Sequence, residues 1–179
     1  MRRGCLFGLI GALTLCLVGC GLVYFVVIPR VRDNAQDGVR EAVGTQVAIQ
    51  IPVGADNTID PGTYELSAEE LQTALRNNIN IDNVEEIVVS ITADGLKLGI
   101  TSSGSETNYT GLPTAVDGRL VMSNMKASDG FLDFVFPANR LGDAIEDAVN
   151  TYLTTNLLQV DSLQLADGKI ILETVPLNS

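Results

Sequence analysis

The hydrophobic positions along the chain follow three spacings, and each spacing predicts a different kind of element. The first is a continuous apolar stretch, Gly4–Ile28, which contains no charged residue. A helix of 25 residues is about 37 Å long at about 1.5 Å per residue. That length is enough to cross a hydrocarbon core of about 30 Å. We therefore expect residues 4–28 to form a transmembrane helix, with arginines on both sides of it.

The second spacing is an alternation of apolar and polar positions, which predicts half-buried strands. It occurs over residues 46–52, 86–93, 96–100, 119–127, 131–136, 158–165 and 169–175. Asp-Gly pairs, a strong hairpin signal, begin at Asp94, Asp117, Asp129 and Asp167. Residues 109–116 are a weaker candidate, because Pro113 cannot donate to a ladder of backbone hydrogen bonds. The pattern thus predicts mainly antiparallel hairpins.

The third spacing, with apolar residues three and four apart, predicts helices. Residues 31–43 form a short, weakly amphipathic helix or stalk, which Gly38 interrupts. A second helix begins at Ser67, where Glu70 completes a capping box. The longest stripe runs over residues 138–156, after Pro137. Proline is well tolerated in the first turn of a helix.

The second and third helices are each followed by a strand, an Ala-Asp-Gly turn and another strand. This helix–β-hairpin repeat predicts an α+β fold, with two amphipathic helices packed on a curved, mostly antiparallel sheet. We therefore divide the chain into a transmembrane helix at 4–28, a stalk or linker at 29–45 and one extracytoplasmic domain at 46–179. The expected location is the cell membrane, with a single pass.

The N-terminal stretch permits two further interpretations. Leu17-Val18-Gly19-Cys20 resembles a bacterial lipobox, in which the cysteine is acylated after cleavage. Cys20 is therefore a candidate lipidation site, and the chain is alternatively a lipoprotein anchored there. An ordinary cleaved signal peptide fits less well, because no small-x-small site is followed by polar sequence. Residues 21–28 stay apolar, which favours the uncleaved spanning helix.

The charge of the chain bears on its partners. The net charge is −11, and from Gln46 onward six basic residues stand against 19 acidic ones. Such a domain is repelled by nucleic acid backbones and by anionic lipid headgroups. We expect no nucleic acid partner. Any lipid is expected to be held by its tails in a cavity, without a basic patch that grasps headgroups.

The residue types present argue against an enzyme. The chain has no histidine, and its three cysteines, Cys5, Cys16 and Cys20, all lie in the apolar stretch. The domain therefore lacks a histidine base, a thiol nucleophile and the residues of a Cys/His zinc site. No phosphate-binding or dinucleotide-binding glycine motif occurs. We predict no enzymatic activity, no cofactor and no metal.

Four segments carry a family resemblance. They are the helix start T-Y-E-L-S-A-E-E-L (63–71), the hairpin V-V-S-I-T-A-D-G-L-K-L (88–98), the strand D-G-R-L-V-M (117–122) and the closing hairpin L-L-Q-V-D-S-L-Q-L-A-D-G-K-I-I-L (157–172). Over Gln46–Val175 the chain resembles small membrane-anchored bacterial envelope proteins. Among these are the phospholipid-binding family typified by a mycobacterial lipomannan elongation factor and, more distantly, tubular lipid-binding (TULIP-like) domains. The resemblance implies an apolar groove for acyl chains between a long helix and a curved sheet.

The groove candidates are apolar residues of the long helix and of the strand before it. They are Leu141, Ile145, Val149, Leu153, Leu132, Phe134 and Phe136. The same stripe would equally form the ordinary core of the domain. The predicted function is therefore non-enzymatic lipid binding or handling. The alternative is a structural or interaction module of the cell envelope that acts through a protein partner, whose identity the sequence does not indicate. A continuous cavity of several hundred Å³ beside this helix, the size of small-molecule pockets, would favour lipid.

Overall fold

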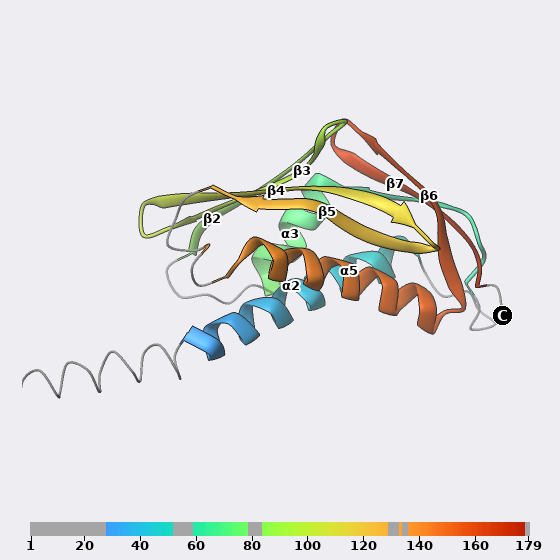
Figure 1. The fold of residues 1–179 in the computed structure, drawn as a ribbon, viewed down its shortest axis with the longest axis horizontal. Coiled ribbons are helices and arrows are strands. Elements are labelled where there is room, and N and C mark those ends of the chain that lie inside the picture. Colours follow the sequence, from blue (N-terminus) through green and yellow to red (C-terminus); the bar gives the residue numbers. More distant parts are fainter. Residues whose placement is uncertain (1–27, 52–58, 79–83, 129–132, 134–135, 178–179) are drawn as a thin grey trace, which may run out of the picture.

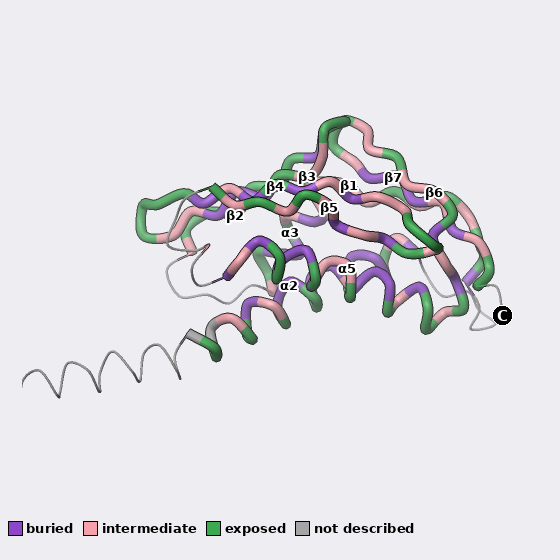
Figure 2. The backbone as a smooth tube through the Cα atoms, in the orientation of Figure 1, coloured by how far each residue is buried: buried purple, intermediate pink, exposed green. Residues whose placement is uncertain are grey.

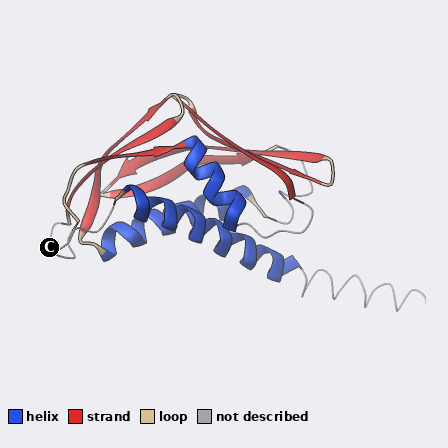
Figure 3. Cartoon of the chain, turned by 180° about the vertical axis from the view of Figure 1, so that it is seen from behind, coloured by secondary structure: helices blue, strands red, loops and turns tan. Residues whose placement is uncertain are grey.

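The strands of the domain form a roof over its helices (Figure 1). The computed structural model describes residues 28–51, 59–78, 84–128, 133 and 136–177. Within them the chain forms three helices and two antiparallel sheets, of three and four strands. Figure 3, the view from behind, shows both sheets on the same side of the helices. The predicted α+β class is confirmed, but the prediction of one curved sheet under two helices is wrong.

The predicted transmembrane helix lies outside the described residues, apart from Ile28. No helix in the part of the chain that the structure describes is long and apolar enough to cross a membrane. The strand predicted over residues 131–136 also falls mostly outside this part. Asp133 and Phe136 are described, and neither belongs to a strand.

Helix α2 (Ile28–Gln50) is longer than the pattern predicts. The helix offered for residues 31–43 is confirmed, but it continues without a break to Gln50, so the strand predicted over residues 46–52 is wrong. Val47 is buried, whereas Ile49, two residues on, is 62% exposed. A strand would place both side chains on one face. The helix separates them and turns Val47 toward the core.

Small residues allow α2 to pack closely against α5 (Ala138–Thr155). Ala42 of α2 and Ala144 of α5 are both fully buried. Beside them, Arg40 donates a hydrogen bond from Nη2 to Oδ2 of Asp147 over 2.7 Å. This ion pair is exposed and contributes about 0–1 kcal/mol, so apolar contact holds the two helices together. The bounds of α5 confirm the helix predicted over residues 138–156.

Four strands follow one another in the larger sheet: β2 (Val84–Thr92), β3 (Gly95–Ser102), β4 (Ser105–Val116) and β5 (Arg119–Ala127). Their spatial order is their chain order, as expected for successive hairpins. Asp117 and Gly118 both have positive φ angles, 50° and 77°. Two adjacent residues in this region are typical of a type I′ turn, and they confirm the predicted hairpin.

Pro113 lies inside β4 without interrupting it. Its partner on β5, Met122, donates its backbone N–H to Oε1 of Glu146 over 2.7 Å. Pro113 and Met122 therefore form a pair that exchanges no backbone hydrogen bonds. The nitrogen of Pro113 faces the other side, where the pairing with β3 has already ended at Leu96 and Gly111. Proline removes no ladder bond there, and β4 becomes the longest of the described strands.

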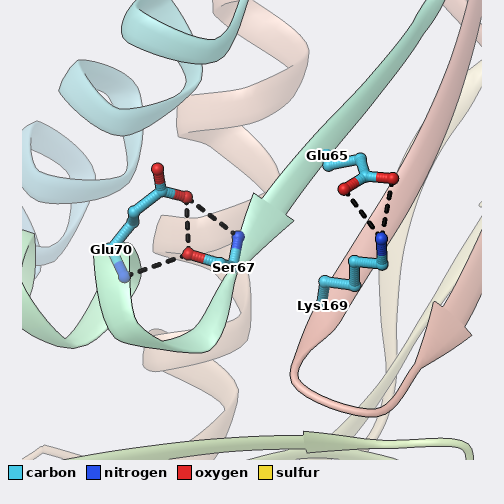
Figure 4. Close-up of polar contacts among 4 residues, drawn as sticks. All are labelled: Glu65, Ser67, Glu70 and Lys169. Atoms are coloured by element: carbon cyan, nitrogen blue, oxygen red, sulfur yellow. Dashed lines mark hydrogen bonds and ion pairs between the residues drawn. The ribbon is translucent and has the colours of Figure 1, made fainter.

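Helix α3 (Ala68–Asn78) starts at the predicted capping box, directly after β1 (Thr63–Ser67). Ser67 Oγ accepts from the Glu70 N–H over 3.2 Å. Oε2 of Glu70 in turn accepts from the Ser67 N–H over 3.2 Å and from its hydroxyl over 2.5 Å (Figure 4). These reciprocal bonds satisfy backbone donors that a helix start leaves free. The predicted start of this helix is confirmed.

The smaller sheet combines a predicted hairpin with a strand that the pattern does not indicate. β6 (Leu158–Ala166) and β7 (Lys169–Pro176) form the C-terminal hairpin. β1 pairs with the other edge of β7, with Leu66 opposite Ile170. These partners lie about a hundred residues apart in the chain. Local periodicity carries no information about such a pairing.

Helix side chains cover the outer edges of the four-stranded sheet. On β2, Gln72 of α3 accepts from the N–H of Val89 over 3.0 Å. On β5, Asn150 of α5 accepts from the N–H of Leu120 and donates to its carbonyl, both over 2.8 Å. Glu146, one turn before Asn150, accepts from the N–H of Met122, the next outward-facing N–H of β5. These contacts leave fewer open backbone groups at edges where another chain could pair.

Two backbone hydrogen bonds join the sheets. Gly168, in the turn between β6 and β7, donates to the carbonyl of Ile91 on β2 over 2.9 Å. Val160 donates to the carbonyl of Gly118, also over 2.9 Å. The predicted order of helix, strand, turn and strand occurs twice, as α3–β2–β3 and α5–β6–β7. The two units meet along this junction.

The buried residues lie where the helices and the sheets face each other, and exposed residues mark the hairpin turns (Figure 2). Tyr109, Leu98, Leu141 and Leu153 are among the largest fully buried side chains. They come from β4, β3 and α5. The described core is therefore one cluster to which all three helices and both sheets contribute.

Candidate functional site

A cavity lies in the middle of this core, between the helices and the roof of strands. Its 21 lining residues come from all three helices and from strands of both sheets. Eighteen of them are apolar, and the accessible wall is apolar throughout. An apolar cavity of this kind stays dry or takes an apolar ligand.

Helix α2 forms one wall of the cavity and α5 another. Val39, Val43 and Val47 line it from α2 at intervals of four. The spacing of the first two was visible in the sequence, but the contribution of this helix to a site was not predicted. β1, which contributes Leu66, was missed as a strand. The cavity therefore depends on two elements that only the tertiary structure reveals.

The structure places the predicted site residues in three groups. Leu141, Ile145 and Val149 line the cavity from α5. Leu153 and Phe136 are buried but lie outside the cavity lining. The remaining two, Leu132 and Phe134, lie outside the described residues, as does Cys20.

Three polar residues, Gln50, Tyr64 and Glu65, stand among the lining residues. None of them is buried, so they mark the end of the cavity nearest to solvent. Gln50 Nε2 donates to Oε1 of Glu70 over 2.7 Å. Glu65 accepts from Lys169 Nζ through both carboxylate oxygens, each over 2.8 Å (Figure 4). Each of these side chains is thus engaged outside the cavity.

Two tyrosines at the same end of the cavity have hydroxyl groups whose pKa is raised. Tyr64 donates to the carbonyl of Asp60, and Tyr152 donates to the carbonyl of Ile51 over 2.6 Å. Burial, followed by the charge of Asp60, raises the pKa of Tyr64. Burial, followed by Tyr64, raises the pKa of Tyr152. Both hydroxyls stay protonated at neutral pH and act as hydrogen-bond donors that hold the ends of α2 and β1.

The cavity is small. Its volume is about 60 Å³, whereas small-molecule pockets usually measure about 300–1,000 Å³. This is less than the several hundred Å³ that we set as favouring a lipid. An acyl chain therefore enters only if the walls of the cavity move apart.

Within the described residues, no group of three or more acidic side chains is arranged to hold a metal ion. Arg40 forms ion pairs with Asp37 and Asp147, and Lys169 forms one with Glu65. The carboxylates at Glu69 and Glu70 diverge, because Glu69 is exposed while Glu70 is engaged in the capping box. Nothing in this arrangement resembles a pair of carboxylates that converge on a substrate.

No protein-family model matches the chain, and a search of the curated proteins found no match. The resemblance to phospholipid-binding envelope proteins therefore stays a prediction. The cavity itself is an apolar space enclosed by α2, α3, α5 and both sheets.

Proposed function

We propose that the chain is a membrane-tethered, non-enzymatic domain that takes the apolar part of a lipid into the cavity beside α5. The single observation that carries this proposal is the uniformly apolar wall, to which all three helices contribute. The apolar stretch Gly4–Ile28 serves as the tether, either as a spanning helix or as a lipoprotein signal ending at Cys20. In both cases the domain lies on the extracytoplasmic side.

In this proposal α2 is the movable wall. It packs against α5, with small residues such as Ala42 and Ala144 fully buried on the two helices. The polar bonds between them are exposed or half-buried, from Arg40 to Asp147, from Arg140 to Gln36 and from Tyr152 to the carbonyl of Ile51. Small side chains bury little apolar area, at about 25 cal/mol per Å². Separating these helices is therefore less costly than separating the hairpins, whose strands are joined by ladders of backbone hydrogen bonds. A lipid acyl chain would widen the cavity by displacing α2.

Native mass spectrometry of the full chain in mild detergent tests the proposal, with and without added dioleoyl phosphatidylglycerol. Two variants on the same helix make a matched pair. Val47→Phe fills the cavity from α2, because Val47 is buried and lines it, whereas Ile49→Phe lies on the exposed side. We expect lipid to bind the wild type and Ile49→Phe but not Val47→Phe. Circular dichroism checks that each variant is folded.

The proposal fails if the wild type binds no lipid after incubation. It also fails if folded Val47→Phe binds as much lipid as the wild type. The small volume of the cavity favours a second candidate, the structural or interaction module of the envelope. That function predicts a stoichiometric protein partner when the native membrane complex is purified, and a core that no added lipid enters.

A further inference from the structure

A second hollow lies on the opposite face of the four-stranded sheet, away from the helices. It is a groove of about 340 Å³ with mixed walls, in which six of the ten lining residues are polar, and we call it the polar groove. Its lining includes Lys97 from β3, Thr110 from β4, and Asn124 and Lys126 from β5. Asp94, in the β2–β3 turn, is the one acidic residue that lines it. Leu96 lines both hollows, but none of the polar residues of this groove lines the apolar cavity. The argument for the groove does not rest on the proposed lipid function.

Strand register brings the two lysines together. Lys97 pairs with Thr110, and Thr110 pairs with Lys126, so the three residues form one row across β3, β4 and β5. Adjacent strands are about 4.8 Å apart, which places the backbones of the two lysines about 10 Å from each other. Both side chains are exposed. They are long enough for both ammonium groups to reach one ligand between them.

A bulge in β5 is what places Lys126 on this face. Leu120 and Met122 are buried, and strict alternation would also turn residues 124 and 126 inward. The pairing shifts by one residue at this point, and Asn124 has a positive φ angle of 56°. After the shift Met125 packs against the core and Lys126 faces outward. Bulges commonly redirect side chains at functional sites.

Two glycines make room for the inward turn of Met125. A Cβ atom on Gly111 of β4 would lie 2.2 Å from the Met125 sulfur, and one on Gly142 of α5 would lie 2.9 Å from its Cγ. Gly111 also lines the groove. The bulge, the two glycines and the position of Lys126 thus form one connected arrangement.

Charge indicates what the groove would bind. Lys97 and Lys126 are two of only six basic residues after Gln46. In the part of the chain that the structure describes, neither forms an ion pair. Two unneutralised like charges in one row of a sheet repel each other. A ligand with two negative charges between them would offset that repulsion, and the hydroxyl of Thr110 and the amide of Asn124 can donate to it.

We propose that this groove binds a phosphate group, carried either by a small soluble molecule or by a lipid headgroup. Lys97 and Lys126 supply the two positive charges, and Thr110 and Asn124 supply hydrogen bonds. Asp94 opposes binding by its charge. Lysine binds phosphate as a point charge, so the site requires two converging chains and no fixed bidentate geometry.

The test uses the full chain in non-ionic detergent at constant ionic strength, with two probes. Inorganic phosphate is titrated calorimetrically, and dioleoyl phosphatidic acid is compared with zwitterionic dioleoyl phosphatidylcholine by native mass spectrometry. We expect Lys97→Gln and Lys126→Gln each to weaken phosphate binding about tenfold or more, the loss typical of one charged hydrogen bond. Asp94→Asn should strengthen binding, because it removes the one negative charge among the residues that line the groove.

Arg119→Gln is the control, because it removes one positive charge from β5 outside the groove and should leave binding unchanged. Lysine-dependent binding of inorganic phosphate supports a soluble ligand, and a lysine-dependent preference for phosphatidic acid supports a headgroup. The proposal is overturned if neither probe binds saturably, or if Arg119→Gln weakens binding as much as the lysine variants. Val47→Phe should leave phosphate binding intact, which separates this test from that of the cavity.

Discussion

Asn150 of α5 makes the hydrogen bonds at the edge of β5 that an adjacent strand would make. Removing its side chain should be among the single changes that most reduce the stability of the domain. It is 6% exposed, on the face of α5 turned to the sheet. Its amide accepts from the N–H of Leu120 and donates to the carbonyl of the same residue, both over 2.8 Å. This is the pair of bonds that a residue on an adjacent strand would make.

The substitution Asn150→Ala leaves both backbone groups of Leu120 without a partner. Leu120 is itself buried, at 4% exposure, so water does not readily replace the amide. An unsatisfied buried donor or acceptor costs about 1–3 kcal/mol, and the two together predict a loss of about 2–5 kcal/mol. The total free energy of unfolding of a domain is only about 5–15 kcal/mol. The melting temperature should fall by roughly 5–15 °C.

Urea and thermal unfolding of the full chain in detergent measure this loss. The matched control is Asn156→Ala at the end of the same helix. Asn156 is half-buried and makes one side-chain hydrogen bond, to the carbonyl of Tyr152 over 2.7 Å, so its loss should stay near about 1 kcal/mol. If Asn150→Ala is no less stable than Asn156→Ala, the idea that this side chain completes the sheet is refuted.

Three further predictions concern the core and its caps. Burial and the charge of Asp133 raise the pKa of Tyr109 well above 10.0. Above pH 10.0 the folded state therefore keeps the phenol proton that the unfolded state loses. Stability should therefore fall as the pH rises past the ordinary value of 10.0, and urea unfolding of Tyr109→Phe at alkaline pH should show a shallower fall. Gly111→Ala should cost about 1–3 kcal/mol through overpacking, and adding Met125→Ala should recover part of it in thermal melts; no recovery would refute the contact. Glu70→Ala should lower the free energy of unfolding by about 0.5–2 kcal/mol, whereas an unchanged urea midpoint would show that the capping box is dispensable.

Local signals explain the parts of the fold that the sequence predicts correctly. The apolar stripe of α5 and the alternation of β2 each depend on residues within one element. The turn at Asp117-Gly118 requires positive φ angles, which Asp and Gly tolerate. The capping box of α3 links residues three positions apart. Each of these structures is decided by neighbours in the chain, so a pattern a few residues long is sufficient to predict it.

The errors occur where distant contacts decide the outcome. Residues 46–51 fit a strand through Val47, Ile49 and Ile51, but they also fit a helix through Val43, Val47 and Ile51. Packing against α3 and α5 selects the helix and leaves Ile49 exposed. β1 is too short to be recognised without β7. A period of two and a period of four cannot be separated over so few residues.

The candidate sites were predictable only in part. The α5 stripe pointed to Leu141, Ile145 and Val149, but the α2 wall of the cavity depends on how two helices meet. The expectation that no basic patch would form was drawn from overall charge. The polar groove was not predicted, because Lys97 and Lys126 become neighbours only through the pairing of β3, β4 and β5. In addition, the bulge at Asn124 reverses the inward–outward alternation along β5.

Helix α2 contacts the core close to its first residues, and this has a consequence for orientation. Residues 29–45 are helical, and Ala35 is already 2% exposed, so only a few residues of α2 precede its first core contact. A helix turns about 100° and advances about 1.5 Å per residue. Inserting one residue before Ala35 would rotate the first residues of α2 by about 100° relative to the core. The direction in which the cavity and the groove face, relative to the start of α2, is thus set by helical phase.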